Sequence, residues 1–314
     1  MILNPDSAPL TRDIADYPEG IIIPIDKSYR WTSADVIRKV KYAAIRHFGK
    51  KNLKVGHAGT LDPLATGVLL VCIGKATKLA EELQSHDKEY VAGVTFGATT
   101  PSYDLEKEID RFFPHEHISA EAVENALPAF IGEQDQIAPL FSAKSVDGVR
   151  AYELARKLYK TNSGNESVQS SDLDTAAEQL LRVSRINITE LELLSFAGRN
   201  EGLMDRATRG TEAGGPQAER SGGVSEANVH EPSSCQHATT ASSRINVTDN
   251  SALGLPRAEI RMACSKGTYV RAFARDLGEA LGSGAHLDSL QRSRSGQFRV
   301  ENALTVEQAL QKLL

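Results

Sequence analysis

Cysteine is scarce in this sequence of 314 residues, where only Cys72, Cys235 and Cys264 occur. None of the three is spaced as zinc ligands are, and no disulfide pairing is evident from their positions. The sequence therefore predicts structural thiols, no metal centre, and a cytoplasmic protein.

Long apolar runs are also lacking, which excludes a membrane-spanning helix. The first 20 residues have no apolar signal-peptide core and instead contain the acids Asp6, Asp13, Asp16 and Glu19. No P-loop and no dinucleotide-binding glycine pattern is present. With 40% hydrophobic and 25% charged residues, the composition is typical of a globular protein. We expect no nucleotide, redox or metal cofactor.

The net charge of −5 is unevenly distributed. Residues 27–54 hold nine Lys or Arg against one acid, Asp35, a local charge of +8. A basic surface on an acidic body is typical of phosphate binding. The plainer alternative is a solvated helix face. We expect Lys50, Lys51 and Lys54 in this segment to bind RNA phosphates close to the loop that follows.

That loop, Gly56–Gly67, leads directly into the apolar run Val68–Ile73, which reads as a buried strand. Pro63 restricts its own backbone and disfavours helix at Asp62, so the loop presents the Asp62 carboxylate stiffly. Leu-Asp-Pro alone would be ordinary turn chemistry. The full string, Gly-His-Ala-Gly-Thr-Leu-Asp-Pro-Leu-Ala-Thr-Gly, resembles the catalytic loop of TruB-type pseudouridine synthases, which isomerise uridine 55 in the T-loop of tRNA.

The resemblance implies roles for two residues of this loop. Asp62 matches the catalytic aspartate, and His57 on the same loop would occupy the space that the flipped uridine vacates. Upstream, Asp26–Ser33 is similar to the family's Asp-Lys-Pro-x-Gly-x-x-Ser, with Lys27 expected at the substrate. Ser28 and Arg30 replace the usual proline and glycine. Ser33 is the expected N-cap of a helix over 34–48.

The remaining matches lie further along the chain. Tyr90 falls on an expected strand over 88–96, where the family has a tyrosine at the target base; alone, it would read as a half-buried strand aromatic. Cys264–Gly278 resembles a family segment that contains Tyr269 and the arginine placed against the catalytic aspartate, here Arg271. A cation in the first turn of a helix is disfavoured by the macrodipole, so Arg271 indicates a nearby anion. In Gly284–Gly296, Leu290 matches an apolar active-site residue.

The domain organisation follows from the same comparison. We expect a polar tail over 1–19 and a catalytic domain over 20–314, with flexible insertions at about 160–178 and 199–250. The second insertion separates two strands, 185–196 and 257–264, that form a hairpin in the family. The acidic segment 102–124 is expected to face away from RNA. No room remains for the C-terminal PUA domain of many bacterial members. The implied fold is α+β, a mixed and mostly antiparallel sheet flanked by helices with a central active cleft.

The chemistry implied is cleavage of the C1′–N1 bond and reattachment of uracil through C5. An ionised carboxylate suits this bond, as in glycoside hydrolysis, and Tyr90 would stack on the base and take or relay the C5 proton. The residues do not distinguish attack by Asp62 at C1′, attack at C6, or elimination. Two alternatives stay open: an RNA-folding or tRNA-binding factor, and a guide-RNA-dependent synthase of the dyskerin type. We expect a monomer with tRNA as partner and no obligate protein partner.

Overall fold

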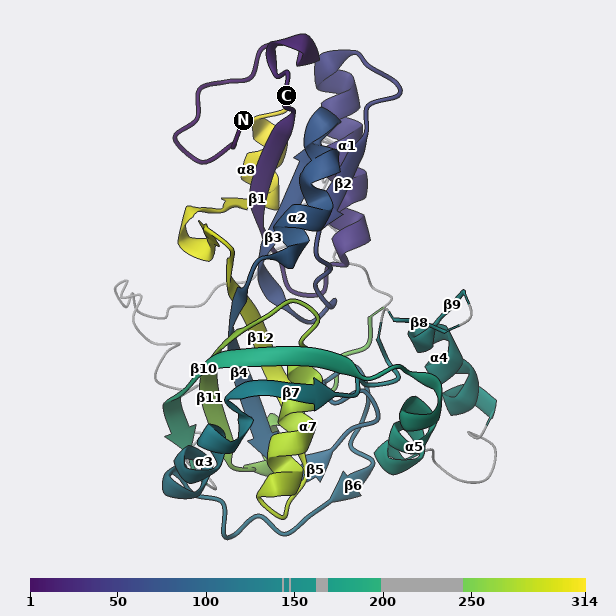
Figure 1. Ribbon diagram of the computed structural model, residues 1–314, viewed down its shortest axis with the longest axis vertical. Coiled ribbons are helices and arrows are strands. Elements are labelled where there is room, and N and C mark those ends of the chain that lie inside the picture. The colour runs from purple at the N-terminus through teal and green to yellow at the C-terminus, as the bar shows by residue number, and fades with distance from the viewer. Residues whose placement is uncertain (143, 147, 162–168, 199–244) are drawn as a thin grey trace, which may run out of the picture.

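The computed structural model describes residues 1–314 apart from 143, 147, 162–168 and 199–244 (Figure 1). Among the described residues, ten strands form one sheet in the order β14-β1-β3-β12-β4-β11-β10-β7, with β2 beside β3 and β13 beside β12. Only the pairs β1–β14 and β3–β12 are parallel. The expected mixed, mostly antiparallel sheet is therefore confirmed. In chain order the strands of this sheet are β1 (Ile21–Lys27), β2 (Val55–Ala58), β3 (Thr66–Ile73), β4 (Lys88–Phe96), β7 (Gly132–Gln136), β10 (Ser184–Ala197), β11 (Arg257–Cys264), β12 (Ala285–Ser295), β13 (Phe298–Arg299) and β14 (Leu304–Thr305).

Helices cover the sheet, and two small strand pairs extend from it (Figure 1). The helices are α1 (Ser33–Phe48), α2 (Ala80–Ser85), α3 (Ala120–Ala126), α4 (Ala151–Thr161), α5 (Ser170–Leu180), α7 (Val270–Ala280) and α8 (Val306–Gln311). The small pairs are β5 (Ala98–Thr99) with β6 (Arg111–Phe112), and β8 (Ser145–Val146) with β9 (Val149–Arg150). In the part of the chain that is described, no helix has both the length and the apolar character needed to cross a membrane.

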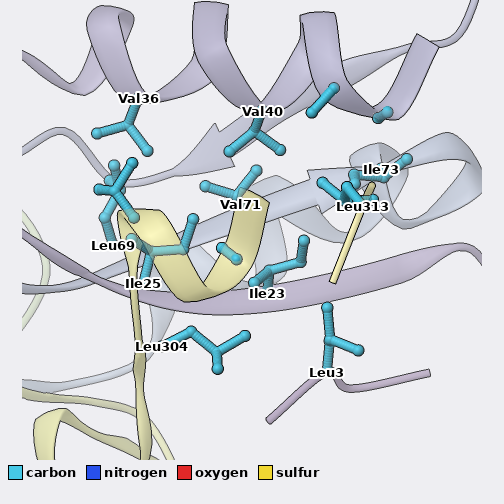
Figure 2. Packing of buried hydrophobic residues seen from close by; sticks show 14 of the residues in the cluster. Leu3, Ile23, Ile25, Val36, Val40, Leu69, Val71, Ile73, Leu304 and Leu313 are labelled. Atoms are coloured by element: carbon cyan, nitrogen blue, oxygen red, sulfur yellow. The ribbon is translucent and has the colours of Figure 1, made fainter. Parts of the chain in front are cut away.

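The first core lies where α1 and α8 pack on β1 and β3 (Figure 2). Alternate residues of β1 enter it, and α1 contributes Val36 and Val40, which are spaced one turn apart. The helix begins with a capping box in which Thr32 is the N-cap and Asp35 reaches back to it. The expected N-cap was Ser33, one residue later. Ser33 is instead the first helical residue, and its hydroxyl bonds to the backbone of Leu61.

The second core lies under α7, which packs against β12 and β4. Its inward residues, Val270, Phe273, Ala274 and Leu277, are all buried, as the helical periodicity predicts. The two cores make two lobes, seen above and below the middle of Figure 1. Tyr90 and Leu290 are packed against both cores, which places them between the lobes.

The lobes are joined in the sheet at β12. This strand pairs with β4 along most of its length, but with β3 at only two positions, Gln291 with Thr66 and Arg292 with Gly67. Gly67 has a positive φ of 95°, and a Cβ there would lie 2.2 Å from the carbonyl oxygen of Arg292. Glycine is thus required for this close approach. The loop carrying Asp62 enters β3 at this junction.

Two expectations about flexible segments need correction. Residues 1–19 are not a polar tail, because Leu3 and Leu10 are buried in the first core and the backbone of Leu3 donates to Ile22. Burial of these apolar side chains stabilises the segment against the sheet. The acids of the segment remain exposed to solvent, so their charges are not desolvated. Part of the insertion at 160–178 is helix α5, in which Leu173 and Ala177 are buried.

The predicted pairing of the strands around the second insertion is confirmed, since β10 and β11 are antiparallel neighbours. Most of the expected insertion at 199–250 lies outside the described residues. Its last part, 245–250, is in contact with the body of the protein. Arg30 donates to the carbonyl of Ile245 at 2.9 Å, and the amide of Thr248 donates to Leu105 at 2.9 Å.

Candidate active site

The loop from Gly59 to Ala65 connects β2 to β3 and is held at its centre by one hydroxyl. The Oγ of Ser33 accepts a hydrogen bond from the amide of Leu61 at 3.0 Å and donates to the carbonyl of Leu61 at 3.1 Å. Within the loop, the amide of Ala65 donates to the carbonyl of Asp62 at 3.1 Å. These bonds fix the backbone on both sides of Asp62, so its side chain is presented from a rigid support.

Lys27 holds the next residue of the loop. Its ammonium donates to the carbonyls of Trp31 at 2.7 Å, Ser28 at 3.0 Å and Pro63 at 3.3 Å. The side chain is fully buried, and burial lowers the pKa of Lys27 to about 8. Lys27 was expected to contact the substrate, but it does not line the cleft and all three of its donors are used. Its place in the structure is that of a support for the loop.

Asp62 forms an ion pair with Arg271, which lies 209 residues away in the sequence. The Nε of Arg271 donates to Oδ2 of Asp62 at 2.9 Å, and the Nη2–Oδ2 distance is also 2.9 Å. The aspartate side chain is 41% exposed whereas the arginine side chain is 6% exposed. The carboxylate therefore faces solvent while a buried cation holds it from behind. This ion pair is the anion contact that the position of Arg271 in the first turn of α7 indicates.

Arg271 has further partners that the sequence did not reveal. Its Nη1 donates to the carbonyl of Ser102 at 3.0 Å, and its Nη2 donates to that of Phe141 at 2.8 Å. A second carboxylate, Asp104, lies 3.7 Å from Nε. Burial opposes the charge of Arg271, but Asp62 and Asp104 raise the pKa of the guanidinium above its ordinary value.

Asp104 is nearly inaccessible, at 7% exposure, and accepts hydrogen bonds from Ser102 Oγ at 2.6 Å and the amide of Glu106 at 2.9 Å. Burial raises the pKa of Asp104 even though Arg271 acts in the opposite direction. The segment 102–124 was expected to face away from the RNA. At Asp104 it instead reaches the active site, because a buried guanidinium with a single exposed partner would be poorly compensated.

A cleft of about 400 Å³ opens in front of Asp62. Tyr90, Tyr269, Leu290 and Arg271 line it together with Asp62, so five of the residues expected at the site share one cavity. Burial raises the pKa of the Tyr90 phenol, and Arg292 beside it acts in the opposite direction. Tyr90 is therefore a neutral phenol at pH 7.

The cleft is strongly cationic. One carboxylate, that of Asp62, lines it among six cations, which are Lys88, Lys144, Arg150, Lys266, Arg271 and Arg292. Such a lining suits a polyanion. Of these cations only Arg271 was expected, since the others come from separate elements and do not form a run in the sequence.

The other expected contacts lie outside this cleft. His57 is on β2, half-buried and not among the lining residues; its Nδ1 is buried without a hydrogen-bond partner among the described residues, and burial lowers its pKa. Lys50, Lys51 and Lys54 are exposed on the connection between α1 and β2. Since Ser33 at the start of α1 touches the loop, the 16 residues of the helix put Lys50, which follows the other end of α1, about 24 Å away. The sequence suggested that these lysines lie close to Asp62; none of them lines the cleft.

Within the described residues, no group of three or more His, Cys, Asp or Glu side chains is placed to hold a metal ion. The groups available for chemistry in the cleft include a carboxylate, two phenols and several cations.

Two family models match this chain. One, described as the TruB family pseudouridylate synthase N-terminal domain, matches residues 46–201, and the other, described as the tRNA pseudouridylate synthase B C-terminal domain, matches residues 271–314. In the structure the second range begins in α7 and includes β12, a central strand of the sheet. The second matched region therefore contributes a strand next to β3, the strand into which the Asp62 loop leads.

Curated relatives cover nearly the whole chain. It is 43% identical over 292 residues to a tRNA pseudouridine synthase B of Phocaeicola vulgatus, covering 93% of this chain and 92% of that protein. A protein of the same name from Flavobacterium johnsoniae is 36% identical over 300 residues, covering 94% and 98%.

Solved structures show the same fold at lower identity. A chain in the crystal structure of a Cbf5–Nop10–Gar1 complex is 20% identical with a TM-score of 0.53, and one in an H/ACA RNP bound to a substrate RNA containing 2′-deoxyuridine is 19% identical with a TM-score of 0.51. Each match covers 98% of this chain but only 59% and 61% of the other chains.

Proposed function

This chain belongs to the TruB family of pseudouridylate synthases, and on that premise we propose that it converts uridine 55 in the T-loop of tRNA to pseudouridine in the cytoplasm. It is an isomerase acting on tRNA. The observation that supports the assignment of its active site is the exposed Asp62 carboxylate, held by the buried Arg271 at 2.9 Å in a cationic cleft. The T-loop position and the role of each residue are our proposals.

The reaction breaks the C1′–N1 bond, turns the uracil, and joins C5 to C1′; the proton on C5 is lost and N1 gains one. The carboxylate of Asp62 assists cleavage at the electron-poor anomeric carbon. Arg271 holds that carboxylate and aims it into the cleft. Tyr90 begins as a neutral phenol, because burial raises its pKa, so it relays the C5 proton and does not start as a phenolate base. Leu290 and Tyr269 border the space for the base.

The direct test is release of tritium from a tRNA transcript labelled at C5 of its uridines, with the purified protein and no guide RNA. We expect release of one label per tRNA, at position 55. Binding without release would instead favour an RNA-folding factor. Release that requires a guide RNA and partner proteins would favour the guide-dependent class.

For Tyr90, we expect the substitution Tyr90→Phe to lower the single-turnover rate by about 10²–10⁴-fold, the usual contribution of a proton-transfer group. The ring that stacks on the base is retained, so tRNA affinity should change by less than about threefold. Single-turnover kinetics and filter binding measure the two quantities separately. A near-normal rate would leave the ring with a packing role only.

For the basic segment, we expect tRNA affinity to fall steeply with salt. Replacing Lys50, Lys51 and Lys54 together with Ala should flatten the plot of log affinity against log salt by about two to three units, since each phosphate contact contributes about 0.7–0.9. Turnover at saturating tRNA should not change, because none of these lysines lines the cleft in front of Asp62.

The matched control is Arg185→Ala with Arg261→Ala, which removes two cations that are already paired with carboxylates on the outer strands. It should leave the salt slope unchanged. A triple lysine variant with the wild-type slope would place the RNA on another face and leave the basic run as a solvated surface.

A further inference from the structure

Arg292 is a nearly inaccessible arginine, 2% exposed, whose guanidinium donates to three backbone carbonyls and also bonds to the phenol of Tyr90. Its Nε donates to Val68 at 2.7 Å, its Nη2 to Gly59 at 3.2 Å and its Nη1 to Thr60 at 3.4 Å. Gly59 and Thr60 begin the loop that carries Asp62. The guanidinium thus holds the start of that loop by hydrogen bonds, while Ser33 bonds to its middle and Lys27 to its later part.

The backbone position of Arg292 differs from those of the other two supports. Ser33 and Lys27 belong to the first lobe, as the loop does. Arg292 is on β12, directly opposite Tyr90 of β4 on one side and Gly67 of β3 on the other. Opposed residues of an antiparallel pair have their side chains on the same face of the sheet. Arg292 therefore links β12, which pairs with the strand of Tyr90, to the loop that carries Asp62.

No carboxylate among the described residues lies within ion-pair distance of Arg292, although Arg271, Arg275 and Arg257 each have at least one. A buried charge without a counter-ion is in general strongly destabilising. Its charge acts on the groups around it: burial and then Arg292 lower the pKa of His57 and of Lys88, the latter to about 8. A neutral side chain with hydrogen-bond donors, such as Gln, could donate to some of the carbonyls that Arg292 bonds, and its burial would cost less desolvation energy.

We propose that Arg292 is a positioning residue for the isomerisation: it locks the Gly59–Thr60 end of the loop onto β12, so that Asp62 and Tyr90 approach the uridine from fixed relative positions. The proposal rests on the proposed function, because it assigns Arg292 a part in that reaction. Since β3 and β12 are paired at only two positions, the sheet alone constrains the two lobes weakly. A displacement of about 1 Å between reacting groups costs about 10²-fold in rate.

The test compares Arg292→Lys and Arg292→Met with the wild type. Lys keeps the charge but reaches one or two of the three carbonyls, and Met keeps the bulk alone. We expect the single-turnover rate at saturating tRNA to fall by about 10²-fold in Arg292→Lys and further in Arg292→Met. The dissociation constant for tRNA should change by less than about threefold in Arg292→Lys, because the ammonium retains the positive charge at the cleft.

The matched control is Arg294→Met, two residues along the same strand, whose guanidinium is near Glu89 and donates to Gly296; it should keep the wild-type rate. Rates are normalised to the folded fraction from thermal unfolding curves. If Arg292→Met does not fold, the Arg292→Lys protein alone tests the proposal. An Arg292→Lys protein with the wild-type rate, or with rate and affinity lowered by the same factor, would overturn the proposal. Inactivity of the wild-type protein would instead contradict the proposed function.

Discussion

Asp62→Asn is expected to lower the rate of pseudouridine formation by more than about 10⁴-fold, the scale seen when an enzyme loses its central reacting group. The amide keeps the size of the carboxylate and an oxygen that accepts from Arg271, but it has no charge with which to assist cleavage at C1′. The fold should survive, because Arg271 keeps its bonds to Ser102 and Phe141 and its proximity to Asp104. Tritium release under single-turnover conditions measures the loss.

Affinity for tRNA should be unchanged or slightly higher in Asp62→Asn, since the substitution removes the one carboxylate in a cleft lined by six cations. The matched control is Asp135→Asn, the same chemical change in an exposed pair with Arg185, which should retain full activity. If Asp62→Asn kept more than a small fraction of the wild-type rate, the assignment of Asp62 would be wrong.

Asp62 and Arg271 could be found from the sequence because they occur in contiguous motifs. Asp62 lies in a twelve-residue string, and Arg271 occupies a helix position that is unfavourable for a cation unless an anion is near. The structure contains that anion 2.9 Å away. Strand and helix positions around these motifs also follow from periodicity, as the inward face of α7 illustrates.

The supports of the site could not be predicted in the same way. Lys27, Asp104 and Arg292 are charged residues whose function depends on burial, and a charged residue in a sequence is by default exposed. Lys27 was accordingly assigned to the substrate, and Asp104 to a surface away from RNA. Burial of each is possible only because partners distant in the chain supply hydrogen bonds, and that pairing is not visible in one sequence.

Distance along the chain also misled the placement of the basic residues. Lys50, Lys51 and Lys54 precede Asp62 by fewer than fifteen positions, but they follow a helix that runs away from the loop. Adjacency in sequence is a poor guide here, because the strand β2 lies between these lysines and the loop. The cations that do line the cleft, such as Lys88 and Lys266, come from separate strands and turns, and only the fold brings them together.

Arg271→Met is expected to abolish activity and to destabilise the protein, for two separable reasons. Asp62 loses the group that aims it, and Asp104 is left buried without its cation; removal of one partner of a buried pair typically costs about 3–5 kcal/mol. Burial already raises the pKa of Asp104, and loss of Arg271 raises it further. Protonation of such a carboxyl favours the folded state, so the stability deficit should grow as pH rises through that pKa and shrink in acid.

The double variant Arg271→Met with Asp104→Asn separates the two reasons. An amide in place of Asp104 removes the unpaired charge while it can still bond to Ser102 and the amide of Glu106. We therefore expect thermal unfolding at pH 7 to return most of the way to the wild-type midpoint, whereas tritium release stays below about one hundredth of the wild-type rate. Recovery of both would make Arg271 a residue needed only for folding. Recovery of neither would mean that Asp104 is not the source of the instability, because the bonds from Arg271 to Ser102 and Phe141 would then dominate.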